Sequence, residues 1–277
     1  MKVSVYEGRT IKHDEYTCER MAGDTEMGGR QIQAVQISCD ILEALRELDG
    51  AGVTELAEHL DISKATVHGH LSTLYKNEFV VKEGDWYRVS LRFVNFGEFA
   101  KDSIPIYDIA RDEVDSLANQ TGEVAQFMVE EHGRGVYLHK SVGEKAIQTR
   151  SYAGARKYLH CTALGKAILA HLPEERVDEI VARHGLSQQT DRTISTREEL
   201  ESELETVREQ GVAFDDEEIL AGLRCVAAPV TGHDGTLYGA ISVSGPTSRM
   251  KGDRFTEELP EQVQGAANVI QVNATQL

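Results

Sequence analysis

The order of helical and extended patterns over residues 31–89 constrains the fold of this chain more than any other feature. Apolar residues recur at three- and four-residue steps from the start of this segment, which is the period of an α-helix, and a pair of glycines ends the pattern. Thr54 begins a short helical pattern over residues 54–60. After a turn, residues 64–77 carry a third pattern with apolar positions four and three residues apart. The sequence therefore predicts three helices in close succession.

Two short β-rich runs follow the third helix. Residues 79–82 and 86–89 flank the turn Glu83-Gly84-Asp85, and a pair of such runs around an acid–glycine turn predicts a hairpin. Helix, helix, turn, helix and hairpin in this order are typical of a winged helix-turn-helix, a module that reads DNA in the major groove. A small helical domain that binds another protein is the alternative for the same pattern.

Acidic residues are missing from the third helix. Residues 62–77 contain no Asp or Glu, while the two preceding helices carry several glutamates. Ser63 is a natural N-cap for this helix. Hydroxyl groups and a lysine at a helix N-terminus donate to phosphates, and the helix dipole favours an anion there. The candidate DNA-binding residues on its polar face are Ser63, Lys64, Thr66, His68, His70 and Thr73.

The formal net charge of −17 ordinarily argues against a nucleic-acid partner, because phosphate binding draws on Lys and Arg. The 46 acidic residues are, however, spread along the whole chain against 29 basic ones. Diffuse acidity of this kind keeps a protein soluble at high ionic strength, so we expect a halophilic host, with an acidic mesophile as the alternative. Local departures from the acidity are more informative about partners than the total.

Cysteine and histidine spacing argues against a metal site. The four cysteines are far apart and form no CxxC pair, which excludes a typical zinc module or disulfide framework. His68 and His70 are two residues apart on a helix and do not share a face. No apolar run is long enough for a transmembrane helix, and the polar N-terminus lacks the apolar core of a signal peptide. We expect a soluble cytoplasmic protein with no metal, no cofactor and no membrane partner.

The remainder of the chain predicts a second domain. Helical patterns over residues 91–100 and 106–117 lead into it, and two pairs of β runs around glycine-rich turns follow among further helices. Strand pairs without strand–helix–strand alternation predict an α+β domain with an antiparallel sheet. The expected organisation is a flexible extension at residues 1–30, the winged helix-turn-helix domain at residues 31–100, a linker helix at residues 101–120 and the second domain at residues 121–277.

Motifs of common enzyme classes are missing from this sequence, including GxSxG, GxGxxG after a strand, GxxxxGK[ST] and HExxH. Residues 145–173 form a second acid-free stretch, which holds five basic residues: Lys145, Arg150, Arg156, Lys157 and Lys166. This stretch indicates a pocket or surface that tolerates an anion. A subunit interface or strands that lack charge because they are buried are the alternatives.

Three separated motifs resemble those of IclR-type transcriptional regulators. Residues 54–97 contain T-E-L-A…S-K-A-T-V-H-x-H-L-S-T-L and a glycine-turned wing, as in the DNA-binding domain of that family. Residues 159–172 read L-H-C-T-A-L-G-K-A-I-L-A-H-L, and residues 211–245 contain G-V-A-F-D-D-E-E-I-L-A-G-L-R-C-V-A-A-P-V and A-I-S-V-S-G, as in its effector domain. One departure is Gly69, where many members carry arginine.

The resemblance implies a GAF-like effector domain that binds small molecules, often carboxylates, and a homodimer or dimer of dimers on operator DNA. It adds Thr54 and Ala65 to the candidate DNA-binding residues. The effector-binding positions that it implies are Ala163, Leu164, Asp215, Leu223, Cys225, Ser242 and Ser244.

The side chains at these positions suit a small organic acid. Ser242 and Ser244 alternate on one predicted strand, so both hydroxyl groups lie on the same face. Ala163 and Leu164 open a predicted helix, whose amide groups are placed to receive a carboxylate. Leu223 is expected to form an apolar wall of the effector pocket. Asp215 and Cys225 are suited to orient a hydroxyl or carbonyl group of the effector, although Asp215 opposes a bare anion.

The sequence thus predicts a ligand-responsive transcriptional regulator of haloarchaeal type that is not an enzyme. Its partners are double-stranded operator DNA and a small-molecule effector of the carboxylate class. A metabolite-processing enzyme with a protein-interaction module is the alternative. A second alternative is a zinc-dependent sensor that uses His139, His160 or Cys161, but no spacing typical of zinc ligands supports it.

Overall fold

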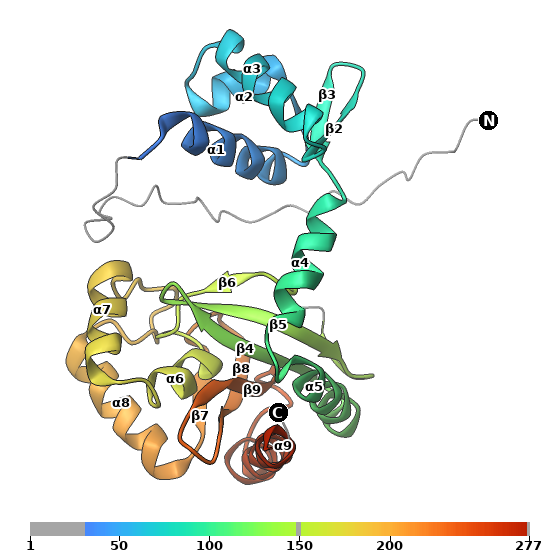
Figure 1. Ribbon diagram of the computed structural model, residues 1–277. Helices are drawn as coiled ribbons and strands as arrows, with labels where there is room; N and C mark the ends of the chain where they lie inside the picture. Colours follow the sequence, from blue (N-terminus) through green and yellow to red (C-terminus); the bar gives the residue numbers. More distant parts are fainter. Residues whose placement is uncertain (1–30, 148–150, 276–277) are drawn as a thin grey trace. The chain divides into compact units, whose positions relative to one another are not determined.

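The computed structural model describes residues 31–147 and 151–275, and Figure 1 traces the chain through them. Contacts divide the chain into two compact units, Met1–Glu98 and Phe99–Leu277. The extension predicted at residues 1–30 lies outside the described residues, as does Arg150 of the acid-free stretch. The first unit has one hydrophobic core, and the second unit has two.

The first unit has the predicted order of elements. Its elements are α1 (Gln33–Glu47), β1 (Ala51–Gly52), α2 (Val53–Leu60), α3 (Lys64–Lys76), β2 (Val80–Glu83) and β3 (Trp86–Val89), and α4 (Arg92–Asp102) follows. The three strands form an antiparallel sheet in the order β1-β3-β2. The prediction of a winged helix-turn-helix is confirmed.

The start of α2 differs from the prediction. Gly52, not a hydroxyl residue, is the N-cap of α2, and it makes no side-chain capping bond. Gly52 also pairs with Trp86 in the sheet, so strand pairing determines where this helix begins. Thr54 is therefore an exposed residue of the first helical turn.

The second unit is built on a six-stranded antiparallel sheet with the strand order β6-β5-β4-β9-β8-β7. Its strands are β4 (Val124–Glu131), β5 (Arg134–Val142), β6 (Arg156–Lys157), β7 (Ala213–Asp216), β8 (Leu223–Thr231) and β9 (Leu237–Pro246). Its helices are α5 (Tyr107–Thr121), α6 (Ala163–Leu169), α7 (Glu174–His184), α8 (Arg197–Gln210) and α9 (Leu259–Ala274), the last preceded by a π-helical turn at Arg254–Glu258. The expected α+β class with an antiparallel sheet is confirmed.

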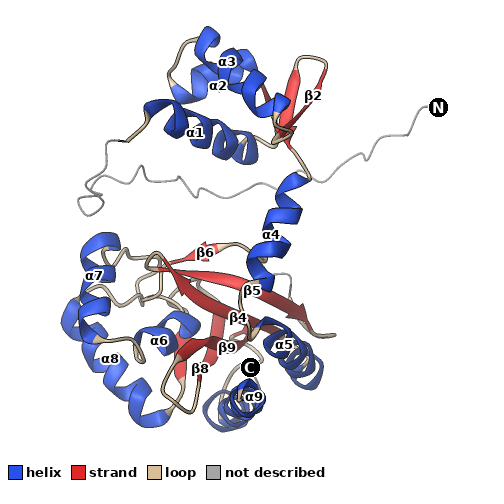
Figure 2. Cartoon of the chain, viewed as in Figure 1, coloured by secondary structure: helices blue, strands red, loops and turns tan. Residues whose placement is uncertain are grey.

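Helices cover both faces of this sheet (Figures 1 and 2). Helices α5 and α9 pack on the face that presents Ile241 and Val243, while α6, α7 and α8 pack on the face that presents Ala227 and Ala240. Successive side chains of a strand point to opposite faces, so each strand contributes to both cores. Residues 101–120 were expected as a linker, but α5 buries Ala110, Val114 and Leu117 in the first of these two cores.

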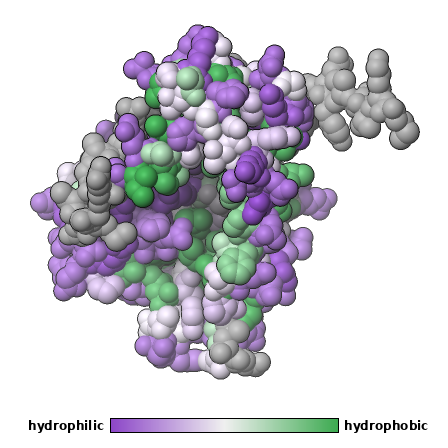
Figure 3. Space-filling view, turned by 45° about the horizontal axis from the view of Figure 1, so that its top comes forward, coloured by the Kyte–Doolittle hydropathy of each residue, from purple (hydrophilic) through white to green (hydrophobic). Residues whose placement is uncertain are grey.

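The described part of the chain contains no helix that is both long and apolar enough to cross a membrane. Figure 3 shows hydrophilic residues over most of the face in view, with smaller apolar patches between them.

Candidate functional site

The N-terminus of α3 is built as an open, capped helix end. The Ser63 hydroxyl accepts a hydrogen bond from the backbone N–H of Thr66 at 3.1 Å and lies 2.8 Å from the Thr66 hydroxyl. This confirms the predicted N-cap. On the opposite side of the helix, Val67 and Leu71 are fully buried and hold α3 on the rest of the unit. The face that begins with Ser63 therefore stays exposed in a fixed orientation.

The predicted DNA-binding residues fall into two groups. Thr54, Ser63, Lys64, Ala65, His68 and Thr73 are exposed, and Thr66 is half-buried. His70 differs, because its Nδ1 atom lies 2.8 Å from the hydroxyl of Ser38 on α1. The half-buried His70 therefore joins two helices. The Thr73 hydroxyl donates to the backbone carbonyl of Gly69 at 3.1 Å.

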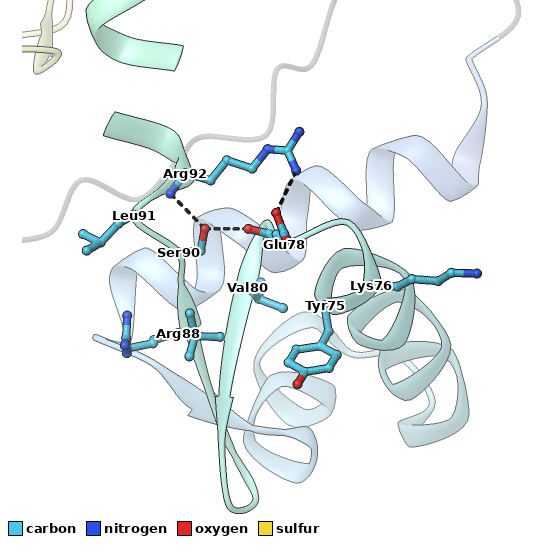
Figure 4. A pocket seen from close by; sticks show the side chains of 9 residues that line it. Tyr75, Lys76, Glu78, Val80, Arg88, Ser90, Leu91 and Arg92 are labelled. Atoms are coloured by element: carbon cyan, nitrogen blue, oxygen red, sulfur yellow. Dashed lines mark hydrogen bonds and ion pairs between the residues drawn. The ribbon is translucent and has the colours of Figure 1, made fainter. Parts of the chain in front are cut away.

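The C-terminal end of α3 is tied to the start of α4 (Figure 4). The Ser90 hydroxyl donates to the carbonyl of Glu78 at 2.6 Å and accepts from the backbone N–H of Arg92 at 3.0 Å. The Arg92 guanidinium donates to the carbonyl of Asn77 at 2.7 Å and lies 4.9 Å from the centre of the Phe79 ring. These contacts connect the end of α3, the hairpin of β2 and β3, and the start of α4.

Basic and aromatic side chains line an open groove at this junction. Tyr75, Lys76, Arg88 and Arg92 contribute to it from α3, β3 and α4. Sequence reasoning did not include these residues, because they come from three elements that only the folded chain brings together.

In the second unit, the strand register places the predicted effector residues on one face of the sheet. Asp215 pairs with Cys225, and Cys225 pairs with Ser244. Ser242 lies two residues from Ser244 along β9, and Leu223 lies two residues from Cys225 along β8, so all five share a face. Helix α6 covers this face, because Ala163 and Leu164 belong to the same hydrophobic cluster as Cys225.

The helix that begins with Ala163 and Leu164 covers this face with apolar side chains. Both residues are almost completely buried. The hydroxyl of Thr162 caps the helix by accepting from the N–H of Gly165 at 3.0 Å. Because α6 has only seven residues and one of its first amides is already bonded, the predicted contact of its amides with a carboxylate finds no support.

Buried polar atoms without hydrogen-bond partners gather on and beside this face. Within the described residues, the Gln126 Nε2, Ser242 Oγ, Asp215 Oδ2 and Glu218 Oε2 atoms are buried and make no hydrogen bond. Gln126 on β4 pairs directly with Ser242. A buried polar group that makes no hydrogen bond costs about 1–3 kcal/mol, so four of them in one region indicate the place of a missing partner.

Lys166, which the sequence analysis counted among the basic residues of an anion-tolerant surface, is buried beside this face. Its side chain is only 2% exposed, and its Nζ atom lies 2.7 Å from Glu203 Oε1 and 2.6 Å from Glu218 Oε1. The two carboxylates come from α8 and from the loop after β7. Lys166 is therefore neutralised by residues far away in the sequence and does not serve as the free cation that the acid-free stretch suggested.

Burial dominates the titration behaviour of this region. Desolvation raises the pKa of Asp215 to about 7, and the neighbouring Glu218 charge adds to that shift, against the backbone N–H of Glu218 and the Lys166 ammonium. Burial, followed by the Asp215 charge, raises the pKa of the Cys225 thiol well above its ordinary value and that of Cys161 to about 12. Both thiols are therefore protonated at neutral pH, which does not favour a nucleophilic role.

Family comparisons agree with this architecture. Residues 34–84 match the IclR helix-turn-helix domain, and residues 99–272 match the C-terminal domain of bacterial transcriptional regulator IclR. The chain is 35% identical to the probable HTH-type transcriptional regulator ArcR of Halobacterium salinarum, over 88% of this chain and 94% of that protein. The chain belongs to the IclR family.

Solved structures show the same fold. The crystal structure of Thermotoga maritima IclR matches with a TM-score of 0.71 and 29% identity, over 87% of this chain and 96% of that one. An IclR homolog from Microbacterium hydrocarbonoxydans, crystallised with 4-hydroxybenzoate, matches with a TM-score of 0.76 and 17% identity, over 88% of this chain and 100% of that one. The relatives are transcriptional regulators, so this chain is a DNA-binding transcriptional regulator.

The first testable prediction concerns Asp215. Its pKa of about 7 lies above the usual value of about 3.9 in an unfolded chain, so the folded state binds the extra proton between these values. The contribution of this carboxyl group to stability therefore falls as pH rises from 4 to 8. We expect the difference in melting temperature, Asp215→Asn minus wild type, to be more positive at pH 8 than at pH 5. Circular dichroism measures both melting temperatures.

Asp234→Asn is the matched control. Hydrogen bonds from Thr236 lower the pKa of this exposed aspartate, so it is ionised at both pH values. Its effect on the melting temperature should be the same at pH 5 and pH 8. An equally constant effect of Asp215→Asn would contradict the argument from burial.

Proposed function

We propose that the exposed face at the N-terminus of α3 contacts operator DNA through Ser63, Lys64, Ala65, Thr66 and His68, with Thr54 and Thr73 beside it. The observation that carries the proposal is the capped, acid-free end of a helix whose other side is buried. Exposed amides, hydroxyl groups and a lysine at such an end suit phosphate oxygens, and the side chains next to them suit base edges.

High salt is the expected setting for this interaction. The net charge of −17 is diffuse, and the chain has a relative from Halobacterium salinarum. A halophilic cytosol would screen the repulsion between the acidic surface and DNA, because the Debye length falls to about 3 Å at 1 M salt. Contacts that are close and local, such as those at α3, then decide the affinity.

A charge reversal at Lys64 tests the DNA contact. We expect Lys64→Glu to weaken binding several-fold for all duplex sequences and to reduce the salt slope by about 1, as the loss of one phosphate contact does. Fluorescence anisotropy with promoter DNA over a KCl series measures both quantities.

Lys251→Glu is the matched control, because it makes the same change in net charge at an exposed position of the second unit. It should leave affinity nearly unchanged. Equal losses in the two variants would show that only total charge matters and would remove α3 from the interface.

The effector site is proposed on the sheet face that carries Asp215, Leu223, Cys225, Ser242 and Ser244, under Ala163 and Leu164. The observation that carries this proposal is the group of buried, unpartnered polar atoms there. Gln126 joins the set, because its Nε2 atom is one of them and Gln126 pairs with Ser242. The amide and hydroxyl groups suit a carboxylate, and the related homolog crystallised with 4-hydroxybenzoate supports this class of ligand.

Removal of the Ser242 hydroxyl tests the effector site. In Ser242→Ala we expect small organic acids to lose most of their effect on the protein–DNA complex, while affinity for DNA alone is unchanged. The substitution also removes an unpartnered buried hydroxyl, so stability should not fall. A panel of acids titrated against the DNA complex gives the measurement. Ser202→Ala, at an exposed position of α8, should respond like wild type. A wild-type response of Ser242→Ala would place the effector elsewhere.

Self-association is proposed through α4. None of the residues of α4 is buried. Two large apolar side chains are strongly exposed: Leu91, just before α4, at 79%, and Phe99, within it, at 75%. Large exposed apolar side chains on one short segment suit contact with a second copy of the chain. Ile106 and Ile109, further along the chain, pack against the core of the second unit.

Phe99→Glu tests this interface. We expect wild type to scatter light as a dimer or larger assembly and Phe99→Glu to shift toward the 30.6 kDa monomer at micromolar concentration. Val272→Glu is the control, since Val272 is also exposed, at 60%, but lies on α9. A monomeric wild type would contradict the proposal, as would dissociation by the control substitution alone.

A further inference from the structure

Two guanidinium groups at the outer edge of the six-stranded sheet have no anionic partner. In the part of the chain that the structure describes, Arg134 on β5 and Arg156 on β6 make no ion pair, and their guanidinium groups make no hydrogen bond. Arg176 nearby is typical of the other arginines, since it lies 2.8 Å from Glu130 and 2.9 Å from Glu179. In a chain with 46 acidic and 29 basic residues, two unpaired arginines together are a distinct feature.

Strand pairing places these two arginines on the same face. Arg156 pairs with Val136 across β5 and β6, and Arg134 lies two residues from Val136 along β5. Residues two apart on a strand share a face, and diagonal neighbours of this kind are about 7–8 Å apart. Two arginine side chains at this separation are able to reach one and the same small group.

The guanidinium of Arg134 is held in a fixed orientation. Its Cζ atom lies 3.6 Å from the centre of the Tyr158 ring, and both side chains are half-buried. The Tyr158 ring lies 5.6 Å from that of the buried His160, whose Nε2 atom is 3.1 Å from the carbonyl oxygen of Ser187. Contact with a ring uses the flat face of a guanidinium, so the N–H groups at its edge stay available for a planar, paired contact.

The end of α7 adds positive charge beside this pair. His184 Nε2 lies 2.8 Å from the carbonyl oxygen of His132, in the turn between β4 and β5 (Figure 1). Burial lowers the pKa of His184, against its hydrogen bond to His132. The charges of Arg134, Arg183 and Arg156 add to this lowering of the pKa. Three guanidinium groups are therefore close enough to act on one imidazole.

The acidic residues of the same turn do not neutralise this charge. Glu130 Oε1 accepts from the backbone N–H of Gly133 at 2.6 Å and from Arg176 at 2.8 Å, so it is already engaged. Glu131 is opposite Arg134 in the ladder, but it is exposed, and among the described residues the two form no ion pair. The charge that would balance Arg134 and Arg156 has to come from outside the chain.

This place is separate from the proposed effector site. Gln126 pairs with Lys140, whereas Glu131 pairs with Arg134, so the two places are five residues apart along β4. At about 3.3 Å per residue, this is on the order of 16 Å. Occupation of one place therefore does not require the other.

We propose that Arg134 and Arg156 form an anion site for a phosphate group. Two guanidinium groups offer paired N–H donors in the geometry of phosphate oxygens, and together they balance the two negative charges of a phosphate monoester. A single carboxylate would balance only one of them. The phosphate of a small ester and that of a nucleic-acid backbone share this chemistry, so the experiment separates the two sources.

Isothermal titration calorimetry of the full-length protein with pyrophosphate, at one KCl concentration throughout, tests the site. We expect Arg134→Gln and Arg156→Gln each to weaken binding at least about tenfold, as the loss of a charged hydrogen bond implies. Arg156 is exposed, so its replacement leaves the core intact and decides the question even if Arg134→Gln does not fold. Two controls should bind pyrophosphate like wild type. Arg46→Gln makes the same charge change at an exposed position of α1, and Ser242→Ala alters the proposed effector site.

Fluorescence anisotropy with promoter DNA over a KCl series identifies the source of the phosphate. Unchanged DNA affinity in Arg156→Gln, together with its loss of pyrophosphate binding, assigns the site to a small phosphate ester. A fall in DNA affinity, with a salt slope reduced by about 1 relative to Arg46→Gln, assigns it to the DNA backbone. Undetectable binding of pyrophosphate to wild type together with unchanged DNA affinity in Arg156→Gln would overturn the proposal. Equal losses in Arg46→Gln and Arg156→Gln would do the same, because only net charge would then matter.

Discussion

Alternation of side chains along β8 and β9 is the constraint on which the second unit depends. Ile241 and Val243 enter one core, while Ser242 and Ser244 between them enter the other, so one strand serves an apolar layer and a polar one. A one-residue slip would exchange these faces completely. The register therefore fixes the hydroxyl groups opposite Gln126 and beside Cys225. The buried Ser242 Oγ and Gln126 Nε2 atoms make no hydrogen bond, and such a group costs about 1–3 kcal/mol.

In the first unit, helix α3 likewise has one buried face and one exposed face. Val67 and Leu71 hold α3 on the small core, and Ser63 caps the end that stays open. At the other end of α3, Arg92 donates to the last turn and lies over the ring of Phe79. A cation at a helix C-terminus also complements the helix dipole. Because Arg92 is the first residue of α4, its bond to Asn77 joins the start of α4 to the end of α3.

Local patterns in the sequence predicted the features of the fold that depend on interactions between neighbouring residues. The three helices, the wing, both hairpins of the second unit and the Ser63 cap were predicted correctly, since each depends on neighbouring residues. The start of α2 was wrong, because Gly52 pairs with Trp86, which is 34 residues away. Gln126 and the neutralisation of Lys166 were missed for the same reason. Their roles depend on contacts between distant strands and helices, and the spacing of residues carries no signal for such contacts.

The buried charges of Lys166, Glu203 and Glu218 connect the elements that cover the polar face. A buried ion pair is weak evidence for stability, because desolvation opposes the attraction. Its geometric effect is clear, however, since one ammonium joins α6, α8 and the loop after β7. The Thr193 hydroxyl fastens the same loop by donating to the Glu218 carbonyl at 2.7 Å. A ligand shifts a conformational equilibrium only by its preference for one arrangement. A shift of α6, of α8 or of the loop after β7 would therefore stretch the bonds from Lys166 to Glu203 and Glu218.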